Sequence, residues 1–341
     1  MNMQSPLHST IPATKISMVE KALLQAFNTT EVADIILLAG GLSASVVYKI
    51  TVNDQPYVLK LDSGTPNNIN DELTCMEIAA NGGMAPQVYY LNIADGVSIS
   101  AFIKSEPLQT VFPSIELRLQ ALAQTIKAMH ELPLFTKESS LLDTVDGLIS
   151  QFKASNILTG PVFDEGFAYY ELLKKHYPWD DTDKVSSHND LNPNNMVCDG
   201  EKIWIIDWDA AFKNDRYVDL AITANFFVTN DEHEHIFLQS YFGEDLNDYN
   251  RARFFLMRQV CRLVYAMLMF KLADTSNPMG MGHDPNMQNI NLSDVKQQLG
   301  AGKINLAGYD GQLLFGKALF NEALVSMQSP RFNLSIQQIS V

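Results

Sequence analysis

The segment SHNDLNPNNMV, residues 187–197, places one carboxylate and several amide side chains close together. Within it, Asp190 and Asn195 lie five residues apart, and Asp207 follows twelve residues after Asn195. Phosphoryl transfer requires a carboxylate that orients and deprotonates the attacking hydroxyl, and oxygen ligands for magnesium on the phosphates. Asp190 suits the first role, and Asn195 and Asp207 suit the second. The spacing therefore predicts a phosphoryl-transfer site.

A polar loop is the alternative interpretation of these residues, because Asp and Asn are common in loops. The segment is, however, flanked by apolar runs and keeps a specific spacing to the acidic run IIDWD at 205–209. This arrangement favours catalysis. His188, two residues before Asp190 in the pattern H-x-D-x-x-x-x-N, is expected to position the backbone of the loop rather than to transfer protons.

Two upstream features agree with this chemistry. Lys60 lies inside the apolar run VLKL at 58–61, and Glu72 lies twelve residues later, at the start of a predicted helix, where it can pair with Lys60. A lysine on a strand normally faces solvent, and a Gly-Gly pair is usually only a turn. The run GGLSAS joins two strand-like segments, and its main-chain amides are expected to cover phosphates; its predicted nucleotide-binding members are Gly40, Gly41, Ser43 and Ser45.

The elements that position these residues change character along the chain. Before residue 104 the sequence predicts a helix over 17–28, strand-like runs, a hairpin turn at Asn53-Asp54 and one inserted helix over 70–82. After Ser114, long amphipathic helices dominate, interrupted by the β-rich run at 202–209. Residues 274–304, rich in Gly, Asn, Asp and Met, predict a loop or flap. An α+β fold follows, with a small antiparallel sheet and a large helical part separated by a cleft.

These motifs resemble those of the aminoglycoside phosphotransferase and choline kinase family, whose fold is protein-kinase-like and has two lobes. The resemblance covers about residues 35–230 and includes LAQTIKAMH at 122–130 and Asp219-Leu220-Ala221. It implies a nucleotide-binding lobe over 1–104 and a lobe with the catalytic loop and substrate pocket over 105–341. It also implies that Asp219 braces the catalytic loop.

The same resemblance implies ATP and Mg²⁺ as cofactors and gives the site residues their roles. Lys60 would contact the α- and β-phosphates and Glu72 would hold Lys60, while Asp190 would be the catalytic base. Asn195 and Asp207 would bind magnesium. Ala101 to Ile103 would be the interlobe hinge, where main-chain groups of Ala101 and Ile103 bind adenine.

The departures from protein kinases concern the substrate. The sequence has no full G-x-G-x-x-G, no D-F-G and no A-P-E, and Asn189 stands where protein kinases have an arginine. These differences favour a small-molecule hydroxyl as acceptor. Asp209 is a candidate for contact with the metal or the substrate. Strings such as HNDLNP at 188–193 resemble bacterial choline kinase-like proteins, so a choline- or ethanolamine-like acceptor is predicted.

Other functions stay open at this point. An aminoglycoside or a thiamine-type metabolite is the alternative acceptor. A pseudokinase that binds nucleotide or a partner without turnover is the alternative class. Gly311 to Lys317 matches most of a P-loop, but Ala318 follows it and no apolar strand precedes it, so this match is discounted.

Composition and charge limit the partners and the cell compartment that we expect for this protein. The net charge of −15, from 24 basic and 39 acidic residues, argues against a nucleic-acid partner and is compatible with a cationic substrate. The most apolar long segment, Phe254–Ala273, contains Arg258, Arg262 and Lys271 and predicts a buried helix rather than a membrane span. Three scattered cysteines and no signal-like N-terminus favour a cytoplasmic enzyme. The oligomeric state is left open.

Overall fold

The computed structural model describes residues 6–38, 45–62, 74–181, 183–277 and 282–340. The chain forms two compact units: Met1–Ser114 with Asn194–Asp209, and Ile115–Pro193 with Ala210–Val341. The sequence did not indicate that residues 194–209 would join the N-terminal unit. The predicted division at residue 104 into a nucleotide lobe and a substrate lobe stays a prediction.

The first unit is built on an antiparallel sheet of five described strands in the order β1-β2-β3-β5-β4. In β2, Tyr48, Ile50 and Val52 alternate with less buried residues, as expected for a strand with one face on a core. Asn53 and Asp54, with φ of 49° and 60°, form the predicted two-residue hairpin turn. The strands are β1 (Asp34–Leu37), β2 (Val46–Val52), β3 (Gln55–Leu61), β4 (Val88–Asn92) and β5 (Val97–Ala101).

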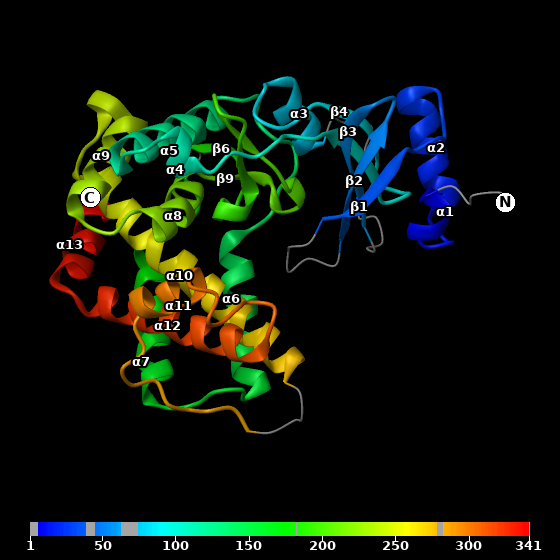
Figure 1. Ribbon diagram of the computed structural model, residues 1–341. Coiled ribbons are helices and arrows are strands. Elements are labelled where there is room, and N and C mark those ends of the chain that lie inside the picture. The colour runs from blue at the N-terminus through cyan, green and yellow to red at the C-terminus, as the bar shows by residue number, and fades with distance from the viewer. Residues whose placement is uncertain (1–5, 39–44, 63–73, 182, 278–281, 341) are drawn as a thin grey trace. The chain divides into compact units, whose positions relative to one another are not determined.

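Helix α2 (Ile16–Phe27) covers this sheet (Figure 1). Its buried residues Val19, Ala22 and Leu23 follow helical spacing and join one apolar cluster with strand residues such as Ile50 and Leu59. The other helices of this unit are short: α1 (Pro6–Thr10), α3 (Cys75–Asn81) and α4 (Leu108–Val111). The predicted helix over 70–82 is confirmed from Cys75 onward, since residues 70–73 lie outside the described residues.

A small hairpin, β7 (Met196–Cys198) with β8 (Ile203–Ile205), explains why residues 194–209 belong to the first unit. The N–H of Ile205 donates to the carbonyl oxygen of Met84 at 2.9 Å, and the N–H of Glu106 donates to that of Cys198 at 2.7 Å. In the turn, one oxygen of Asp199 accepts the N–H groups of Glu201 and Lys202 at 3.0 Å each. The short 3₁₀ helices η1 (Pro193–Asn195) and η2 (Trp208–Ala210) flank this hairpin.

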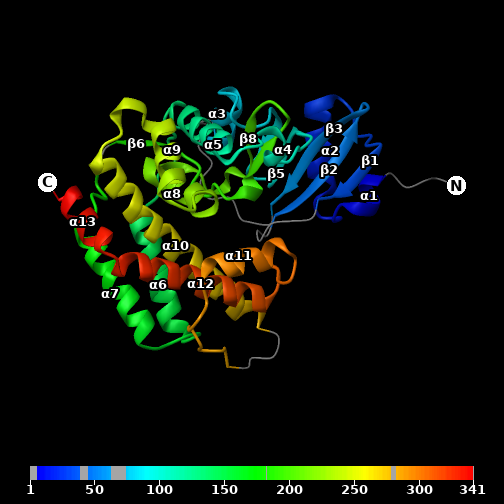
Figure 2. The ribbon, with the colours of Figure 1, turned by 60° about the vertical axis from the view of Figure 1, so that its left-hand side comes forward.

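The second unit is mainly helical, around the long helix α10 (Asp248–Ser276). Most residues from Ala252 to Ala273 are buried, which confirms the predicted buried helix. Figure 2 shows α10 running beside α12 (Tyr309–Gln328) and α6 (Leu141–Ser155). The remaining elements are α5 (Ile115–His130), α7 (Pro161–His176), β6 (Lys184–Ser187), β9 (Phe212–Asp215), α8 (Arg216–Phe227), α9 (Asp231–Phe242), η3 (Gly243–Asp245), α11 (Leu292–Gly300) and α13 (Pro330–Ile339).

The prediction of a loop over 274–304 is wrong for part of that range. Helix α11 occupies Leu292–Gly300, because Asn291 caps its first turn by accepting the N–H of Asp294 at 2.9 Å and Leu292 and Val295 are buried. Residues 278–281 lie outside the described residues. Polar residues flank this short amphipathic helix, so the composition of the whole segment resembles that of a loop.

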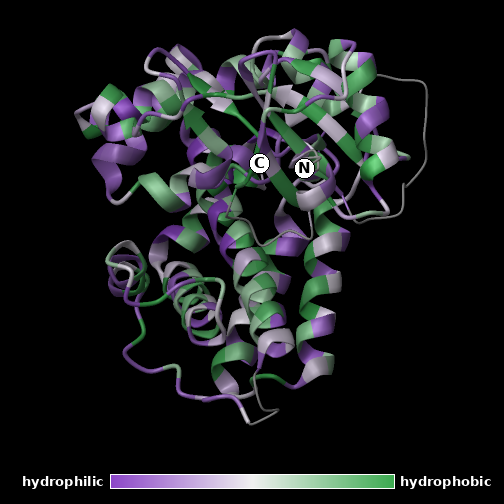
Figure 3. Cartoon of the chain, turned by 45° about the vertical axis from the view of Figure 1, so that its right-hand side comes forward, coloured by the Kyte–Doolittle hydropathy of each residue, from purple (hydrophilic) through white to green (hydrophobic). Residues whose placement is uncertain are grey.

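The rejected P-loop match is confirmed as an ordinary helical segment. Gly311 to Lys317 lie inside α12, and the ammonium of Lys317 donates to the carbonyl oxygens of Asp284 and Asn286. Polar residues interrupt the apolar ones along the long helices (Figure 3), and no described helix is long and apolar enough to span a membrane. The cytoplasmic location stays a prediction.

Candidate active site

Lys60 in the first unit holds two acidic side chains far along the chain. Its Nζ lies 2.9 Å from Oδ1 of Asp207 and 2.6 Å from Oδ2 of Asp209. Burial works to lower the pKa of Lys60, but the two carboxylates outweigh it and raise that pKa above its ordinary value. Lys60 is therefore a charged side chain, 17% exposed, at which two carboxylates converge.

The β7–β8 hairpin brings Asn195 and Asp207 to the same end of one element. Met196 pairs with Ile205, and the N–H of Ile206 donates to the carbonyl oxygen of Asn195 at 3.0 Å. Asp207 follows with φ of 63°, a left-handed conformation that Asp tolerates better than most residues. The twelve-residue spacing in the sequence thus corresponds to one tight hairpin.

Asp219 in the second unit braces the loop that carries Asp190. Its carboxylate accepts the main-chain N–H groups of His188 at 3.0 Å and Asn189 at 2.7 Å, and the Ser187 hydroxyl at 2.8 Å. Asn189 has φ of 65°, so these bonds hold an unusual backbone conformation. The role that the resemblance gave to Asp219 agrees with these contacts.

Asp219 itself is fully buried and has a histidine partner. Nε2 of His130 lies 2.9 Å from the Asp219 carboxylate, and Nδ1 of His130 lies 2.7 Å from the Tyr241 hydroxyl. Burial works to raise the pKa of Asp219, but His130 and the other donors outweigh it and lower that pKa. The brace is therefore an ionised carboxylate inside the fold.

Asp190 accepts two hydrogen bonds at the same oxygen. The hydroxyl of Tyr265 and Nδ2 of Asn192, the latter at 3.1 Å, both donate to Oδ1. His188 is fully buried, and its main-chain N–H belongs to the Asp219 network. These contacts agree with a positioning role for His188, which stays a prediction.

Several predicted site residues lie outside the described residues: Gly40, Gly41, Ser43 and Glu72. The predicted Lys60–Glu72 pair is therefore untested. Ser45 is described, and its hydroxyl donates to Asp62 at 2.6 Å. The N–H of Ala101 donates to the carbonyl oxygen of Gln87 at 2.8 Å, so it is engaged within the sheet and is not an available donor to a nucleotide base. Ile103 follows the end of β5.

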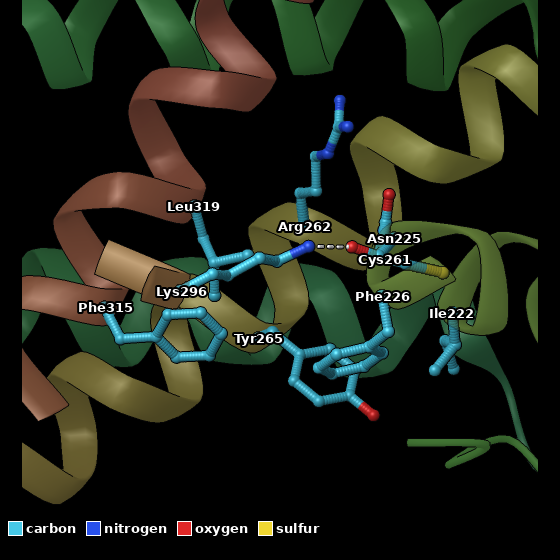
Figure 4. A pocket seen from close by; sticks show the side chains of 9 residues that line it. All are labelled: Ile222, Asn225, Phe226, Cys261, Arg262, Tyr265, Lys296, Phe315 and Leu319. Carbon is cyan, nitrogen blue, oxygen red and sulfur yellow. Dashed lines mark hydrogen bonds between the residues drawn. The ribbon is translucent and has the colours of Figure 1, made fainter. Parts of the chain in front are cut away.

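A pocket in the second unit lies next to Tyr265 (Figure 4). Aromatic side chains of Phe226, Tyr265 and Phe315 line it, and Nζ of Lys296 reaches across to the carbonyl oxygen of Asn225 at 2.5 Å. Burial lowers the pKa of Lys296 to about 8, with the repulsion of Arg262 and Arg258 added. No lining residue is a carboxylate, whereas Arg262 and Lys296 are basic.

Neither Tyr265 nor Lys296 was predicted from the sequence as a residue near the site. A usable signal existed: Arg258, Arg262 and Tyr265 follow i, i+4, i+7 spacing within the most apolar segment, so three polar groups share one face of a buried helix. Lys296 carried no such signal, because α11 was not predicted.

Residues 34–255 match the phosphotransferase enzyme family. The chain belongs to this family. Membership confirms the predicted family and the predicted enzyme class, a small-molecule kinase. A comparison with curated proteins gave no significant match.

Solved structures similar to this phosphotransferase share its fold. A choline/ethanolamine kinase family protein from Mesorhizobium loti is 19% identical, with a TM-score of 0.61 over 90% of this chain and 92% of that one. Choline kinase LicA from Streptococcus pneumoniae is 16% identical, with a TM-score of 0.59 over 91% and 98%. Spectinomycin phosphotransferase APH(9)-Ia, in complex with ADP and spectinomycin, is 15% identical, with a TM-score of 0.56 over 92% and 98%. These likenesses confirm the α+β, kinase-like fold class.

Proposed function

We propose that this phosphotransferase moves the γ-phosphate of ATP to a hydroxyl group of a small molecule. The observation that carries the proposal is the convergence of Asp207 and Asp209 on the ammonium of Lys60. Two carboxylates gathered around the ammonium of a strand lysine form a charge arrangement suited to a metal–phosphate ligand.

The residues present fit a magnesium ion. Asp207, Asp209 and the side-chain oxygen of Asn195 are hard donors of the kind that Mg²⁺ selects, and the Lys60 ammonium shows that the two carboxylates accept a shared positive charge. When bound, the ion would neutralise charge on the phosphates.

Residues of the chain itself would supply the remaining catalytic roles. Lys60, released from the carboxylates, would contact phosphate oxygens of the nucleotide. Asp190 would accept the proton of the acceptor hydroxyl as the oxygen attacks the γ-phosphorus, while the bond from that phosphorus to the β–γ bridging oxygen breaks. Asp219 would keep the Asp190 loop in place through the N–H groups of His188 and Asn189.

The test is magnesium-dependent ATP consumption with a panel of choline, ethanolamine, thiamine, an aminoglycoside and a hydroxylated acid. We expect Asp190→Ala to lower turnover by roughly three orders of magnitude with little change in ATP affinity, because a general base is lost. Asp180→Ala, which changes an exposed aspartate in the same unit, is the control. An Asp190→Ala enzyme as active as the parent would remove the base assignment.

A pseudokinase gives a different pattern in the same assay. It would be stabilised by ATP and magnesium but would consume no ATP with any member of the panel. The presence of Lys60, Asp190, Asn195 and Asp207 together in one sequence supports turnover over simple binding.

The basic residues beside Tyr265 suggest a second candidate acceptor, a hydroxylated acid, although the cavity that they line, about 10 Å³, holds no more than a water molecule unless side chains move. A quaternary ammonium is normally held by aromatic rings together with an anion, but this lining supplies two basic residues and no carboxylate. Lys296 would serve as the counter-ion of an anionic group.

The variant Lys296→Met distinguishes an acidic acceptor from a choline-like acceptor. If the acceptor is an acid, its KM rises about tenfold or more, because one charge-assisted hydrogen bond is lost, while the KM for ATP stays unchanged. Lys303→Met, at an exposed lysine just beyond α11, is the matched control. Efficient choline phosphorylation that is insensitive to Lys296→Met would support the sequence-based prediction instead.

A further inference from the structure

A hydrogen bond links the middle of α10 to Asp190. The Tyr265 hydroxyl donates to Oδ1 of Asp190, a residue 75 positions away along the chain. The amide of Asn192 donates to the same oxygen. All three residues belong to the second unit, so the contact ties the Asp190 loop to the longest helix of that unit.

The Tyr265 ring is itself held in place. It packs edge-on against Phe226, with ring centroids 6.1 Å apart and an interplanar angle of 78°. Its neighbours Cys261 and Ala266 on α10 are buried. In Figure 4 the two rings overlap in the view, and the Tyr265 hydroxyl points away from Lys296. The donor therefore sits on a rigid support.

The Tyr265 hydroxyl remains a donor across the working pH range. Burial raises the pKa of Tyr265 well above its ordinary value, and the charge of Asp190 raises it further. The phenol therefore keeps its proton. It cannot exchange protons with the acceptor near neutral pH, and its effect on Asp190 is one of position.

Position matters for this carboxylate because the terminal torsion of an aspartate side chain is soft, with broad wells. Two donors on one oxygen restrict that torsion. A general base acts only when its oxygen lies within hydrogen-bond reach of the proton it takes, and small misplacements lower the rate steeply. We infer that Tyr265 is a positioning residue that holds the Asp190 carboxylate in its reactive orientation; this inference rests on the proposed function.

A purely structural interpretation makes a different prediction. If the half-buried phenol only satisfies its own hydrogen-bonding need, its loss lowers the stability of the fold and does not change the rate of the chemical step. If it acts through Asp190, its loss lowers kcat with little change in stability or in ATP binding.

Tyr265→Phe, which removes the hydroxyl and keeps the ring, tests the inference. The assay is magnesium-dependent ATP hydrolysis with water as the acceptor. We expect kcat to fall about 10- to 100-fold, the worth of one hydrogen bond to a charged group, while the KM for ATP changes less than about twofold and the melting temperature is nearly unchanged. Tyr249→Phe, the same change at a more exposed tyrosine of α10, should match the parent enzyme.

A double-mutant cycle shows whether the effect passes through Asp190. In the Asp190→Ala background, adding Tyr265→Phe should change the residual turnover by less than about twofold. The inference is overturned if Tyr265→Phe keeps the parent kcat, or if it lowers turnover equally in both backgrounds. Failure of the proposed function looks different, because Asp190→Ala would then be as active as the parent, or the parent would consume no ATP with any member of the acceptor panel.

Discussion

The two units of this phosphotransferase compensate their site charges in different ways. In the second unit, Asp219 is fully buried and accepts hydrogen bonds from Ser187, His188 and Asn189, with His130 beside it. In the first unit, Asp207 and Asp209 are 39% and 58% exposed. They share the ammonium of Lys60.

The difference shows which of these charges are compensated within the protein itself. Every contact of the Asp219 carboxylate named above comes from the fold, so the Asp190 loop is shaped before any ligand arrives. In the Asp207–Lys60–Asp209 arrangement the two carboxylates are exposed to solvent although Lys60 is not, and ion pairs with exposed partners contribute little stability and are readily exchanged for other charges. A ligand that brings both a cation and phosphates can replace each side of it.

Removing the buried brace should have the largest effect. Asp219→Ala leaves three donors and His130 without their acceptor, so we expect the free energy of unfolding to fall by about 3–5 kcal/mol, with activity lost as the Asp190 loop rearranges. Urea and thermal unfolding measure the loss. Asp231→Ala, at an exposed first-turn aspartate of α9, is the control and should change stability by less than about 0.5 kcal/mol. A similar small change for Asp219→Ala would contradict the brace.

Removing the shared cation should act on binding rather than on folding. With Lys60→Met, we expect Mn²⁺ in the absence of nucleotide to bind more tightly, because the ammonium no longer competes for Asp207 and Asp209, while ATP turnover falls about 100-fold. Calorimetric titration with Mn²⁺ and an ATP assay provide the two measurements. Lys21→Met, which breaks an exposed pair with Asp95 in the same unit, is the control. Weaker Mn²⁺ binding by Lys60→Met would show that the pair is not exchangeable.

Lys296 is a third case, a cation buried without a carboxylate in its pocket. Its pKa of about 8 in the folded state lies below the 10.5 of an ordinary lysine, so between these pH values the unfolded chain holds a proton that the folded chain has released. Stability contributed by this group therefore rises with pH across that window. Comparing melting temperatures of the parent and Lys296→Met at pH 7 and pH 9.5 should show the parent gaining relative to the variant. If the difference in melting temperature between the two proteins were the same at both pH values, a lowered pKa of Lys296 would be contradicted.

The exposed hairpin carboxylate Asp199 should matter least. The N–H of Lys202 and the indole of Trp204 lower its pKa to about 2, so its contribution is present above pH 3.8 and is lost as the pH falls through 2. At pH 7 we expect Asp199→Ala to speed amide hydrogen exchange at Glu201 and Lys202 and to cost less than about 1 kcal/mol overall. Unchanged exchange would mean that the β7–β8 turn does not depend on this side chain.

Local patterns predicted much of the fold and part of the site. The Asn53-Asp54 turn, the helix at Ile16–Phe27 and the buried helix over Phe254–Ala273 all follow from turn chemistry and periodicity, which act over a few residues. Helix α11 was missed, because nine residues of amphipathic pattern in a polar stretch give a weak signal. The glycine-rich run and Glu72 lie outside the described residues and stay predictions.

The sequence by itself predicted the phosphoryl-transfer residues, because Asp190, Asn195 and Asp207 lie within 18 residues and their spacing corresponds to one loop and one hairpin. The tertiary structure decided their partners. Lys60 meets Asp207 across 147 residues, and Tyr265 meets Asp190 across 75. Contacts over such separations depend on how whole elements pack, and a residue's neighbours in sequence carry no record of them. The spacing thus predicted the reaction, and the packing decided which distant side chains contact its proposed groups.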